Sequence, residues 1–523
     1  MAQRLIGFTS LWDLIQRRAA DTPDARFVVD ENGASLTFAE YRDASLAVAA
    51  ALHERGIGEG DVVSWQLPTW IDAMVLVGGL ARLGAVQNPI LPIYREREVG
   101  FVVRQAGAKL LVVPGEWRAF DFTAMARAIA AEVDGLEVLT LNRGDSITGD
   151  VSDLPPIPVG GEPFEPGVRH DGPLRWLFYT SGTTADPKGA RHTDNTVAAS
   201  GYAMVDAFDL VPEDRNGLVF PFTHIGGIGW LMSGLMSGCS QVIVEGFIPD
   251  QTIPVLERER VTIAGAGTAF HLAYLAAQRG APDRRLFPET RVFVGGGAAK
   301  PPQLHYEVKD ELGGIGISSG YGLTECPIVS IAYVDATDEQ LANTEGRLGL
   351  GVDVKVVTLA GAIAVRGQEG ELRVKGPNLC LGYTDPALDV DGFDEDGYFR
   401  SGDLGIVRED DHVLITGRLK DVIIRKGENI SAKEVEDLLF THPKVADAAV
   451  IGLPDAASGE RACAVVVATD PSDPPSLPEL FEFCKADGLM VQKIPEQLEI
   501  VEVLPRNPTG KVLKHELRTV YAD

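Results

Sequence analysis

The sequence predicts an α/β fold, in which a large N-terminal domain of layered sheets and helices precedes a small α+β domain. The chain has 523 residues, and a single hydrophobic core stops growing at roughly 250 to 300 residues. Hydrophobic residues make up 45% of the chain and charged residues 23%, as in soluble globular proteins. Extended and helical patterns alternate along it, which indicates strands layered against helices.

The N-terminal part shows this alternation most clearly. An Asn32-Gly33 pair predicts a hairpin turn. Thr37 and Glu40 then form a capping box that opens a predicted helix to about Leu52. Extended GDVVSWQLP is followed by helical WIDAMVLVGGLARLGA, and helical REREVGFVVRQAGA leads into extended KLLVVP. Strand and helix in turn predict α/β layers.

A surface connection rich in proline, glycine and acid is predicted over residues 145–171. The buried strand LRWLFYT follows it, and later apolar strands are predicted at GLVFPF, SQVIVEGF, RVFVGGG and IGISSGYG. Several of these strands end in glycine, as strands do where a ligand approaches the backbone closely.

The pattern changes near Arg418, where the small domain is expected to begin. The run HVLITGRLKDVIIRKGENI is interpreted as a polar-tipped hairpin, and Ser431 with Glu434 as a capping box opening a helix. Strands at ADAAVIGL, ACAVVVAT and QLEIVEV and a helix at SLPELFEFCKA complete an α+β pattern. We therefore predict domains over residues 1–418 and 419–523.

Charge and cysteine usage restrict the partners and the compartment. A formal net charge of −28 repels polyanions, so nucleic acid is not expected as a partner. No apolar run reaches the roughly 18 residues of a membrane-spanning helix, and Asp13 interrupts the N-terminus before a secretory signal develops. Five scattered cysteines suit reduced thiols. The expectation is a cytoplasmic protein with no integral membrane association.

The stretch YTSGTTADPKGARH offers small hydroxyls, bare backbone amides and one lysine within fourteen residues. Hydroxyls and amides donate to phosphate oxygens, and a lysine adds one compact charge. The spacing differs from GxxxxGK[ST], which excludes a Walker-type loop, and a polar surface turn is the alternative. The predicted phosphate-binding residues are Thr180, Ser181, Gly182, Thr183, Thr184 and Lys188.

Four further motifs follow in a fixed order: GYGLTE at 320–325, YFRSGD at 398–403, GRLKD with KGENI at 417–430, and PRNPTGK at 505–511. With the phosphate loop, they resemble the signature set of the adenylate-forming superfamily, and most of all its AMP-forming acyl-CoA synthetases. The resemblance runs from about Leu11 to the C-terminus. It implies the adenylate-forming enzyme fold and an acid–thiol ligase of fatty-acid or related lipid metabolism.

The resemblance assigns roles that fit the chemistry of each side chain. Thr324 would bond the α-phosphate, and Glu325 with Thr184 would hold Mg²⁺, a hard cation that takes oxygen ligands. Asp403 would accept both ribose hydroxyls, with the donors of Arg418 nearby. The adenine would lie along residues 296–300 and beside the GYG tyrosine, so that the remaining nucleotide contacts are Gly297, Ala298, Ala299 and Tyr321.

The implied reaction has two steps and uses ATP, Mg²⁺ and coenzyme A. A carboxylic acid first attacks the α-phosphorus of ATP, and Lys511 would stabilise the charge that develops. The thiol of coenzyme A then displaces AMP. Between the steps the small domain would rotate about a hinge at Lys420, which brings the loop of Gly427 to the active site. The resemblance also allows a homodimer.

Two positions depart from the family pattern. Ala185 stands in the phosphate loop where glycine is usual, which predicts a shifted loop or a slower first step. Ala432 stands where proline or serine is frequent, and is expected to be harmless at the start of a helix.

The segment PFTHIGGIGWL, residues 221–231, is interpreted as the gate of the acyl pocket, with His224 as the gating side chain; a packed histidine is the alternative. Amino-acid-activating relatives carry an aspartate where this chain has Ile225. Because a buried ammonium without a partner is costly, an α-amino acid is not expected. The neighbouring glycines and apolar residues favour an uncharged medium-chain or alicyclic acid.

Other interpretations stay open at this point. The enzyme could load a thiol acceptor other than coenzyme A, or be a nucleotide-binding scaffold without catalysis, although Lys511 and Glu325 argue against the scaffold. Ser318 fits the GxSxG pattern of serine hydrolases, but it runs directly into YGLTE with no elbow helix pattern.

Overall fold

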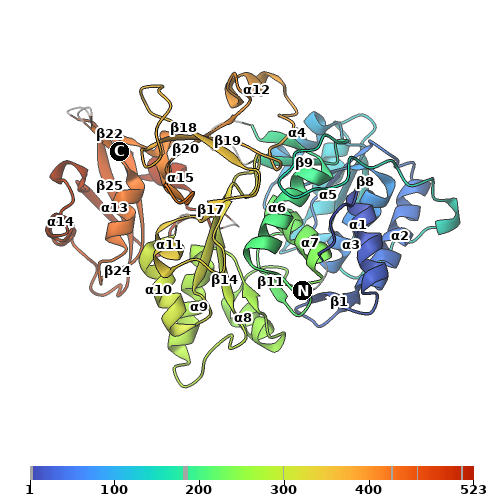
Figure 1. Ribbon diagram of the computed structural model, residues 1–523, viewed down its shortest axis with the longest axis horizontal. Helices are drawn as coiled ribbons and strands as arrows, with labels where there is room; N and C mark the ends of the chain where they lie inside the picture. The colour runs from blue at the N-terminus through green and yellow to red at the C-terminus, as the bar shows by residue number, and fades with distance from the viewer. Residues whose placement is uncertain are drawn as a thin grey trace.

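The computed structural model describes residues 4–180, 186–297, 300–425, 428–455, 458–507 and 510–522. Two large sheets and their helices form the N-terminal body. The C-terminal residues, red at the left of Figure 1, form a smaller body at the opposite end from the blue N-terminal helices. A four-stranded sheet lies between them.

The first sheet has six strands, all parallel except for the antiparallel pair at one edge, β9 and β10. In spatial order they are β10 (Lys188–His192), β9 (Trp176–Thr180), β4 (Val86–Pro89), β3 (Val62–Trp65), β5 (Leu110–Val113) and β8 (Glu137–Thr140). Short apolar strands buried on both faces are typical of parallel sheets that helices cover on both sides.

The second sheet has nine strands, parallel from β1 to β15 and antiparallel at both edges. In spatial order they are β17 (Arg347–Leu348), β16 (Ser330–Ile331), β15 (Ile317–Tyr321), β14 (Val292–Gly296), β13 (Ile263–Ala264), β11 (Arg215–Leu218), β12 (Ser240–Ile243), β1 (Arg26–Asp30) and β2 (Ser35–Thr37). The Asn32-Gly33 turn between β1 and β2 is as predicted, with Gly33 at φ 88°.

The main core lies between the two sheets and contains side chains from both of them. Its helices are α1 (Leu11–Asp21), α2 (Phe38–Glu54), α3 (Ile71–Leu83), α6 (Asp194–Ala207) and α7 (Ile225–Ser237). Helices α4 (Glu96–Ala106) and α5 (Phe122–Ala130) cover the outer face of the first sheet. The outer face of the second sheet is covered by α8 (Pro249–Arg258), α9 (Thr268–Gly280) and α10 (Pro302–Glu311). The predicted capping box of Thr37 and Glu40 opens α2.

The third sheet is antiparallel and joins the two bodies. Its strands are β18 (Asp353–Val357), β19 (Gly370–Lys375), β20 (Phe399–Val407) and β21 (Val413–Arg418), and the 3-10 turn η2 (Leu419–Asp421) follows. The short elements of the N-terminal part are β6 (Glu116–Trp117), β7 (Phe120–Asp121), η1 (Val151–Asp153), α11 (Asp338–Asn343) and α12 (Ala387–Gly392).

A separate C-terminal sheet contains β23 (Glu428–Ile430), β22 (Ile423–Arg425), β25 (Gly459–Ala468), β24 (Val445–Asp455) and β26 (Gln497–Val501). Helices α13 (Ala432–Leu439) and α14 (Leu477–Ala486) pack on one face of it, and α15 (Lys514–Tyr521) packs on the other. The turn η3 (Val491–Lys493) precedes β26.

Three local predictions require correction. The run HVLITGRLKDVIIRKGENI is not one hairpin: β21 pairs with β20 in the third sheet, whereas β22 and β23 form a hairpin in the C-terminal sheet. The predicted strand GLVFPF ends at Leu218. Ser431 caps α13, but the box is incomplete because the Glu434 carboxylate pairs with Lys493 instead.

All five cysteines are buried and free, in agreement with the prediction of reduced thiols. Within the described ranges, no helix combines the length and apolar character that crossing a bilayer requires.

Candidate active site

The carboxyl ends of β14 and β15 place two predicted nucleotide segments side by side. Gly296 on β14 pairs with Gly320 on β15, so Gly297 and Tyr321 leave the sheet at the same edge. Gly297 has φ 73°, a conformation that favours glycine, and a Cβ there would meet nothing within 4 Å. A flat ring can therefore lie against bare backbone. Ala298 and Ala299 lie outside the described residues.

Asp403 is the centre of a buried polar group. It lies on β20 directly opposite Arg418 on β21 and is only 2% exposed. Tyr321 Oη donates to Asp403 Oδ2 at 2.9 Å, and Arg418 Nε lies 2.7 Å from Oδ1. Burial, followed by the negative charge of Asp403, raises the pKa of Tyr321 well above its usual value, so the phenol stays a donor. Each carboxylate oxygen retains a lone pair for a ribose hydroxyl.

Glu325 is an isolated carboxylate at the end of the same strand region, 8% exposed. Tyr383 Oη donates to Glu325 Oε1 at 2.5 Å, and the backbone N–H of Cys380 donates to the Glu325 carbonyl at 2.7 Å. Burial raises the pKa of Glu325, whereas the Tyr383 hydrogen bond and the charge of Lys188 lower it.

The donor set around Glu325 fits magnesium. Among the described residues, no group of three or more His, Cys, Asp or Glu side chains could hold a metal ion. Mg²⁺ does not need such a cage, because it is usually held by one or two carboxylates together with substrate phosphates. The Tyr383 hydrogen bond to Oε1 holds the Glu325 side chain in place, and Glu325 would supply the single carboxylate that such a site requires. The second predicted ligand, Thr184, lies outside the described residues.

Thr324 is fixed through its backbone. The Nε2 atom of His192 lies 2.9 Å from the Thr324 carbonyl, and Nδ1 lies 3.0 Å from Thr196 Oγ1. Burial lowers the pKa of His192 to about 4, so the ring is neutral at pH 7. Because a carbonyl only accepts, Nε2 carries the proton. This leaves the Thr324 side chain to the ligand.

The predicted phosphate loop connects the antiparallel strands β9 and β10. Thr180 ends β9 and pairs with Lys188, the first residue of β10. The Lys188 ammonium lies 5.6 Å from the Tyr383 ring centroid and acts electrostatically on Glu325. Lys188 and Glu325 therefore belong to one local cluster. Ser181, Gly182, Thr183, Thr184 and the unusual Ala185 lie outside the described residues.

Lys511 reaches this site from the C-terminus. Burial is the main cause that lowers the pKa of Lys511 to about 8; the charges of Arg418 and Lys420 lower it further, and those of Asp403 and Asp421 raise it. A Cβ on the neighbouring Gly510 would lie 3.6 Å from Ala269 and Phe270 of α9. The loop of Lys511 is thus seated against the N-terminal body and beside the Asp403–Arg418 pair.

Of the two hinge-related predictions, the structure describes one. Lys420 lies in η2, between the third sheet and the C-terminal sheet. Gly427 lies outside the described residues.

His224 is the N-cap of α7, and its Nδ1 accepts from the Gly226 N–H at 3.1 Å. Its ring lies edge-on to Phe220 with centroids 6.0 Å apart. Burial lowers the pKa of His224 to about 4, so this group is neutral. Both of these contacts, with Gly226 and with Phe220, are made within the segment that contains His224. Neither links His224 to Glu325 or Lys511.

Sequence reasoning missed Tyr383 and His192, which hold Glu325 and Thr324. Both lie in recognisable stretches. His192 is the last residue of YTSGTTADPKGARH, and Tyr383 lies in LGYTDP. No local pattern shows that these side chains turn toward residues 58 and 132 positions away in the chain.

The serine hydrolase interpretation is wrong. Ser318 is fully buried within β15, and its hydroxyl donates to the Ala332 carbonyl at 2.7 Å. A nucleophile elbow needs a strained turn that exposes the serine, and this serine lies inside a strand.

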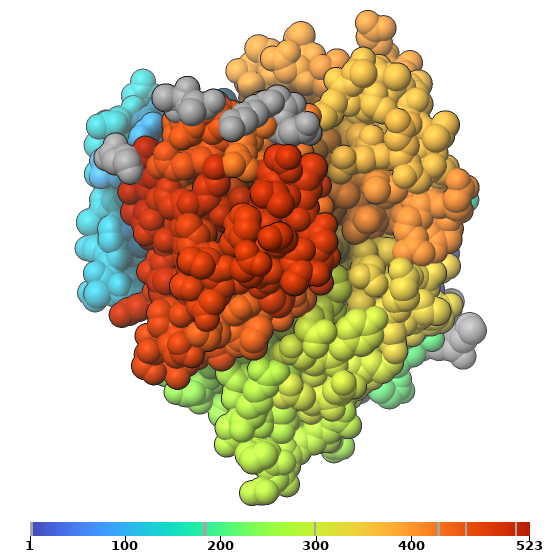
Figure 2. All heavy atoms as spheres, turned by 90° about the vertical axis from the view of Figure 1, so that its left-hand side faces the viewer, coloured from blue at the N-terminus to red at the C-terminus, as the bar shows by residue number. Residues whose placement is uncertain are grey.

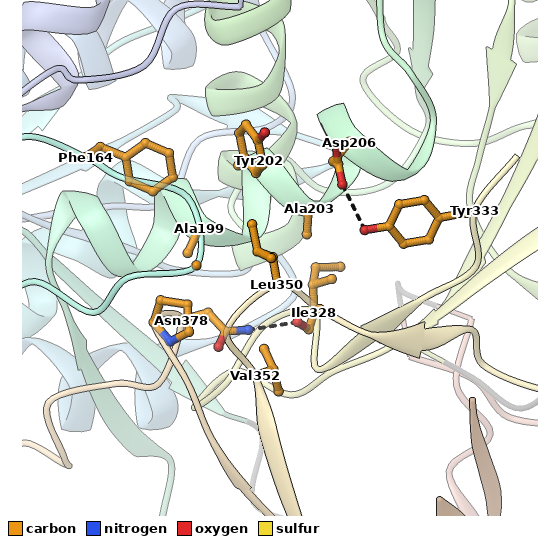
Figure 3. Close-up of a pocket in the computed structure, with 13 residues that line it drawn as sticks. Phe164, Ala199, Tyr202, Ala203, Asp206, Ile328, Tyr333, Leu350, Val352 and Asn378 are labelled. Carbon is orange, nitrogen blue, oxygen red and sulfur yellow. Dashed lines mark hydrogen bonds between the residues drawn. The ribbon is translucent and has the colours of Figure 1, made fainter. Parts of the chain in front are cut away.

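A cavity lies between α6 and the loops around Ile328 and Leu350 (Figure 3). Tyr333 Oη donates to Asp206 at 2.9 Å at one side, and Asn378 donates to the Ile328 carbonyl at 2.8 Å at the other. None of the predicted site residues lines it.

Comparison with known proteins finds matches to both parts of the chain. Residues 15–384 match the model of the AMP-binding enzyme family, and residues 434–511 match the AMP-binding enzyme C-terminal domain. A medium-chain fatty-acid–CoA ligase of Escherichia coli is 32% identical over 99% of this chain and 91% of its own. A salicyl-AMP ligase / salicyl-S-ArCP synthetase of Mycobacterium tuberculosis is 31% identical over 92% of this chain and 85% of its own. ATP-bound MatB of Rhodopseudomonas palustris has a TM-score of 0.86 at 28% identity, covering 98% of this chain and 99% of that one.

Proposed function

The chain belongs to the AMP-binding enzyme family, as an AMP-forming acyl-CoA synthetase that uses ATP, Mg²⁺ and coenzyme A, and on this basis we propose that it activates an uncharged, apolar carboxylic acid. The proposed substrate is either a medium-chain fatty acid or an alicyclic acid. The relative from Escherichia coli, which acts on medium-chain fatty acids, supports the first of these.

The first step joins the acid to the nucleotide. A carboxylate oxygen attacks the α-phosphorus of ATP, an O–P bond forms, and the bond to pyrophosphate breaks with its electron pair. Asp403 and Tyr321 hold the ribose and adenine end, while Thr324 and Lys188 contact the phosphates. Lys511 supplies positive charge where the phosphorus gains oxygen ligands, which stabilises the transition state more than the ground state. Magnesium, when bound by Glu325, neutralises phosphate charge.

The second step releases AMP. The sulfur of the coenzyme A thiol attacks the acyl carbonyl carbon, and the carbon–oxygen bond to AMP breaks. We propose that residues 419–523 turn about Lys420 between the steps, which withdraws Lys511 and brings the loop of Gly427 to the acyl-AMP. The position of Lys420 in η2, between two separate sheets, supports this hinge.

The nature of the acid is argued from α7. Ile225 is 5% exposed and follows His224, which is neutral. Neither residue offers a counter-charge to an α-ammonium, and a buried unpaired ammonium is costly. An uncharged acid meets no such penalty.

The observation that carries the proposed function is the placement of Lys511 beside Asp403 and Arg418. The test is a panel of straight-chain acids of six to twelve carbons, alicyclic acids and α-amino acids, each with ATP, Mg²⁺ and coenzyme A. We expect AMP and pyrophosphate with the apolar acids and none with the amino acids. Release of ADP, or preference for an amino acid, would contradict the proposal.

A carrier-protein thiol is the alternative acceptor, because the salicyl-AMP ligase of similar sequence is also named a salicyl-S-ArCP synthetase. If the rate of thioester formation saturates at micromolar coenzyme A, coenzyme A is supported as the acceptor. Accumulation of acyl-AMP in the presence of coenzyme A would favour the carrier protein.

Location and assembly are also proposed. We propose a cytoplasmic enzyme, since its thiols are free and its substrates are intracellular small molecules. We further propose a homodimer, which light scattering of the purified chain tests directly; a mass of one chain would reject it.

A further inference from the structure

We propose that Asn378 is a positioning residue, whose carboxamide holds a strained turn at Ile328. This turn belongs to the loop of residues 322–329, which connects the antiparallel strands β15 and β16 and carries Thr324 and Glu325. The inference rests on the proposed function, because it concerns what aims these two side chains at the nucleotide and the metal.

The loop is closed by its own backbone. The Leu323 N–H donates to the Cys326 carbonyl at 3.2 Å, and the Cys326 N–H donates back to the Leu323 carbonyl at 3.1 Å. Thr324 and Glu325 are the two residues enclosed by this pair. Their directions therefore depend on the path of the whole loop and not on their own conformations alone.

Ile328 has an unfavourable backbone conformation. Its φ is 57°, in the left-handed region that a β-branched residue rarely adopts. Such a conformation persists only where its surroundings impose it, and it is concentrated at functional sites. At this turn the chain returns to Gly322, where an added Cβ would lie 2.4 Å from the Ile328 nitrogen. The strained turn therefore closes the loop against the residue that precedes Leu323.

Asn378 contacts three consecutive residues of the loop. Its Nδ2 donates to the Pro327 carbonyl at 2.5 Å and to the Ile328 carbonyl at 2.8 Å, and Figure 3 shows the second of these bonds. Its Oδ1 accepts from the Cys326 thiol at 3.3 Å. Because carbonyls only accept, the nitrogen of the carboxamide must face them. Asn378 is 2% exposed, so little water reaches this contact.

A single amine that binds both carbonyls selects the dihedral angles of Ile328. The Pro327 carbonyl belongs to the peptide unit before Ile328, and the Ile328 carbonyl belongs to the unit after it. Since each unit is planar, φ and ψ of Ile328 decide how the two oxygens face one another. Nδ2 can donate to both only when both point toward it. The two hydrogen bonds therefore oppose the strain at Ile328.

The segment that carries Asn378 is itself held in place. Arg169 donates from Nη1 to the Leu379 carbonyl at 2.7 Å and to the Gly376 carbonyl at 3.2 Å. A Cβ on Gly376 would lie 2.8 Å from Asn378 Oδ1, so the missing side chain leaves room for the carboxamide. The carboxamide is thus supported from the side opposite the loop.

These hydrogen bonds lie within the N-terminal body. Figure 2 shows the red C-terminal body beside the yellow and orange residues of the third sheet. Asn378 follows β19 of that sheet, and none of the bonds described for it involves residues 419–523. Asn378 should therefore hold the loop in both arrangements of the proposed two-step reaction.

Without Asn378, Ile328 is expected to relax toward negative φ, and the loop no longer returns to Gly322 along the same path. Thr324 then loses its aim at the α-phosphate, and Glu325 loses its aim at Mg²⁺. On the proposed mechanism the metal acts only in the first step. The first step should therefore slow more than the second.

The experiment compares Asn378→Ala, Ile328→Gly and the double variant in each half-reaction. In Asn378→Ala, acyl-AMP formation should slow by about 10- to 100-fold, as for other outer contacts of metal sites. Ile328→Gly alone should change it by less than about 3-fold, because glycine adopts positive φ readily. The double variant should be faster than Asn378→Ala by about 5-fold or more, since glycine at this φ carries no strain for Asn378 to oppose.

Two matched controls separate positioning from a general loss of packing. Asn378→Ala combined with Ile328→Val keeps a β-branched residue at the turn and should show no recovery. Ser200→Ala removes another hydrogen bond to the Pro327 carbonyl, 2.8 Å long, but leaves Asn378 bound to Ile328, and it should match the unsubstituted enzyme. Failure of Ile328→Gly to restore the rate, or an equal loss in Ser200→Ala, would overturn the inference.

A second readout needs no acid. Binding of Mn²⁺ with ATP, measured by electron paramagnetic resonance, should weaken by about 10-fold or more in Asn378→Ala, and Ile328→Gly should restore most of it. Unchanged binding in Asn378→Ala would overturn the inference. If Asn378→Ala does not fold, Asn378→Ser, which keeps one donor, takes its place in the same comparison. If no acid yields acyl-AMP with the unsubstituted enzyme, the proposed function fails, whereas this binding measurement still tests Asn378.

Discussion

Two parts of the proposed active site are held in different ways. The residues proposed to bind the nucleotide lie on sheet strands, whereas Lys511 comes from the C-terminal body. Tyr321, Asp403 and Arg418 come from paired strands and bond directly to one another. Lys511 follows Gly510, and a Cβ on Gly510 would lie 3.6 Å from Ala269 and Phe270 of the N-terminal body. On the proposed mechanism, the paired strands are a fixed frame for both steps, whereas the loop of Lys511 serves the first step and then leaves.

The strongest way to separate the two regions is Lys511→Ala. Loss of a charge that acts mainly in the transition state should slow acyl-AMP formation by at least about 100-fold. Thioester formation from supplied acyl-AMP should be nearly unchanged, because that step does not use Lys511. Rapid-quench assays of each half-reaction measure this, and equal loss in both would contradict a mobile lysine.

A substitution at Asp403, on the paired strands, should affect both steps rather than only the first. In Asp403→Asn, Arg418 loses its ionised partner and a ribose hydroxyl loses a charged acceptor, so ATP binding should weaken by about 10- to 100-fold. Acyl-AMP carries the same ribose, and its binding in the second step should weaken by a similar factor. If only the first step is affected, Asp403 is not part of a shared frame.

Tyr383→Phe tests the hydrogen bond that supports Glu325, the proposed metal ligand. The substitution removes the hydrogen bond to Glu325 Oε1 and keeps the ring, and loss of such an outer contact typically costs 10- to 100-fold in metal affinity. The Mg²⁺ concentration for half-maximal activity should rise accordingly. Direct binding of Mn²⁺ with ATP, measured by electron paramagnetic resonance, should weaken by the same factor; unchanged binding would show that Tyr383 does not position Glu325.

The pKa of Lys511 predicts a pH limit on the first step only. Because the pKa is lowered to about 8, the cation is present below this pH and is lost as pH rises through it. The kcat/KM for ATP in acyl-AMP formation, which reports the free enzyme, should fall several-fold between pH 7.5 and 9. In Lys511→Arg this fall should disappear, since a guanidinium keeps its charge; a fall that persists would assign the titration to another group.

The smallest effect is expected at Ser318. Ser318→Ala removes one hydrogen bond to Ala332, which costs about 1 kcal/mol of stability. Both half-reactions should keep their rates, and thermal unfolding should shift by a few degrees at most. Loss of turnover with intact folding would reopen a catalytic role for this serine.

The sequence was sufficient for the layers and for the family, because local patterns and ordered motifs carry both. Alternation of strand and helix, the Thr37 cap and the Asn32-Gly33 turn all appear as predicted. The phosphate loop stays a prediction from its hydroxyls and glycines, since four of its predicted residues lie outside the described ranges.

What the sequence could not show is pairing between distant elements. The run around Arg418 was interpreted as one hairpin, since local patterns do not say that β21 pairs with β20 rather than with β22. The roles of Tyr383 and His192 were missed for the same reason. Their partners are set by how distant sheets and loops pack together.

The most direct test of the central claim follows the oxygen atoms. An accepted acid labelled with ¹⁸O in both carboxylate positions is turned over with ATP and coenzyme A, and the AMP is examined by mass spectrometry. If the carboxylate attacks the α-phosphorus, the AMP formed carries one ¹⁸O and the pyrophosphate carries none. Unlabelled AMP, or label in pyrophosphate, would contradict the account.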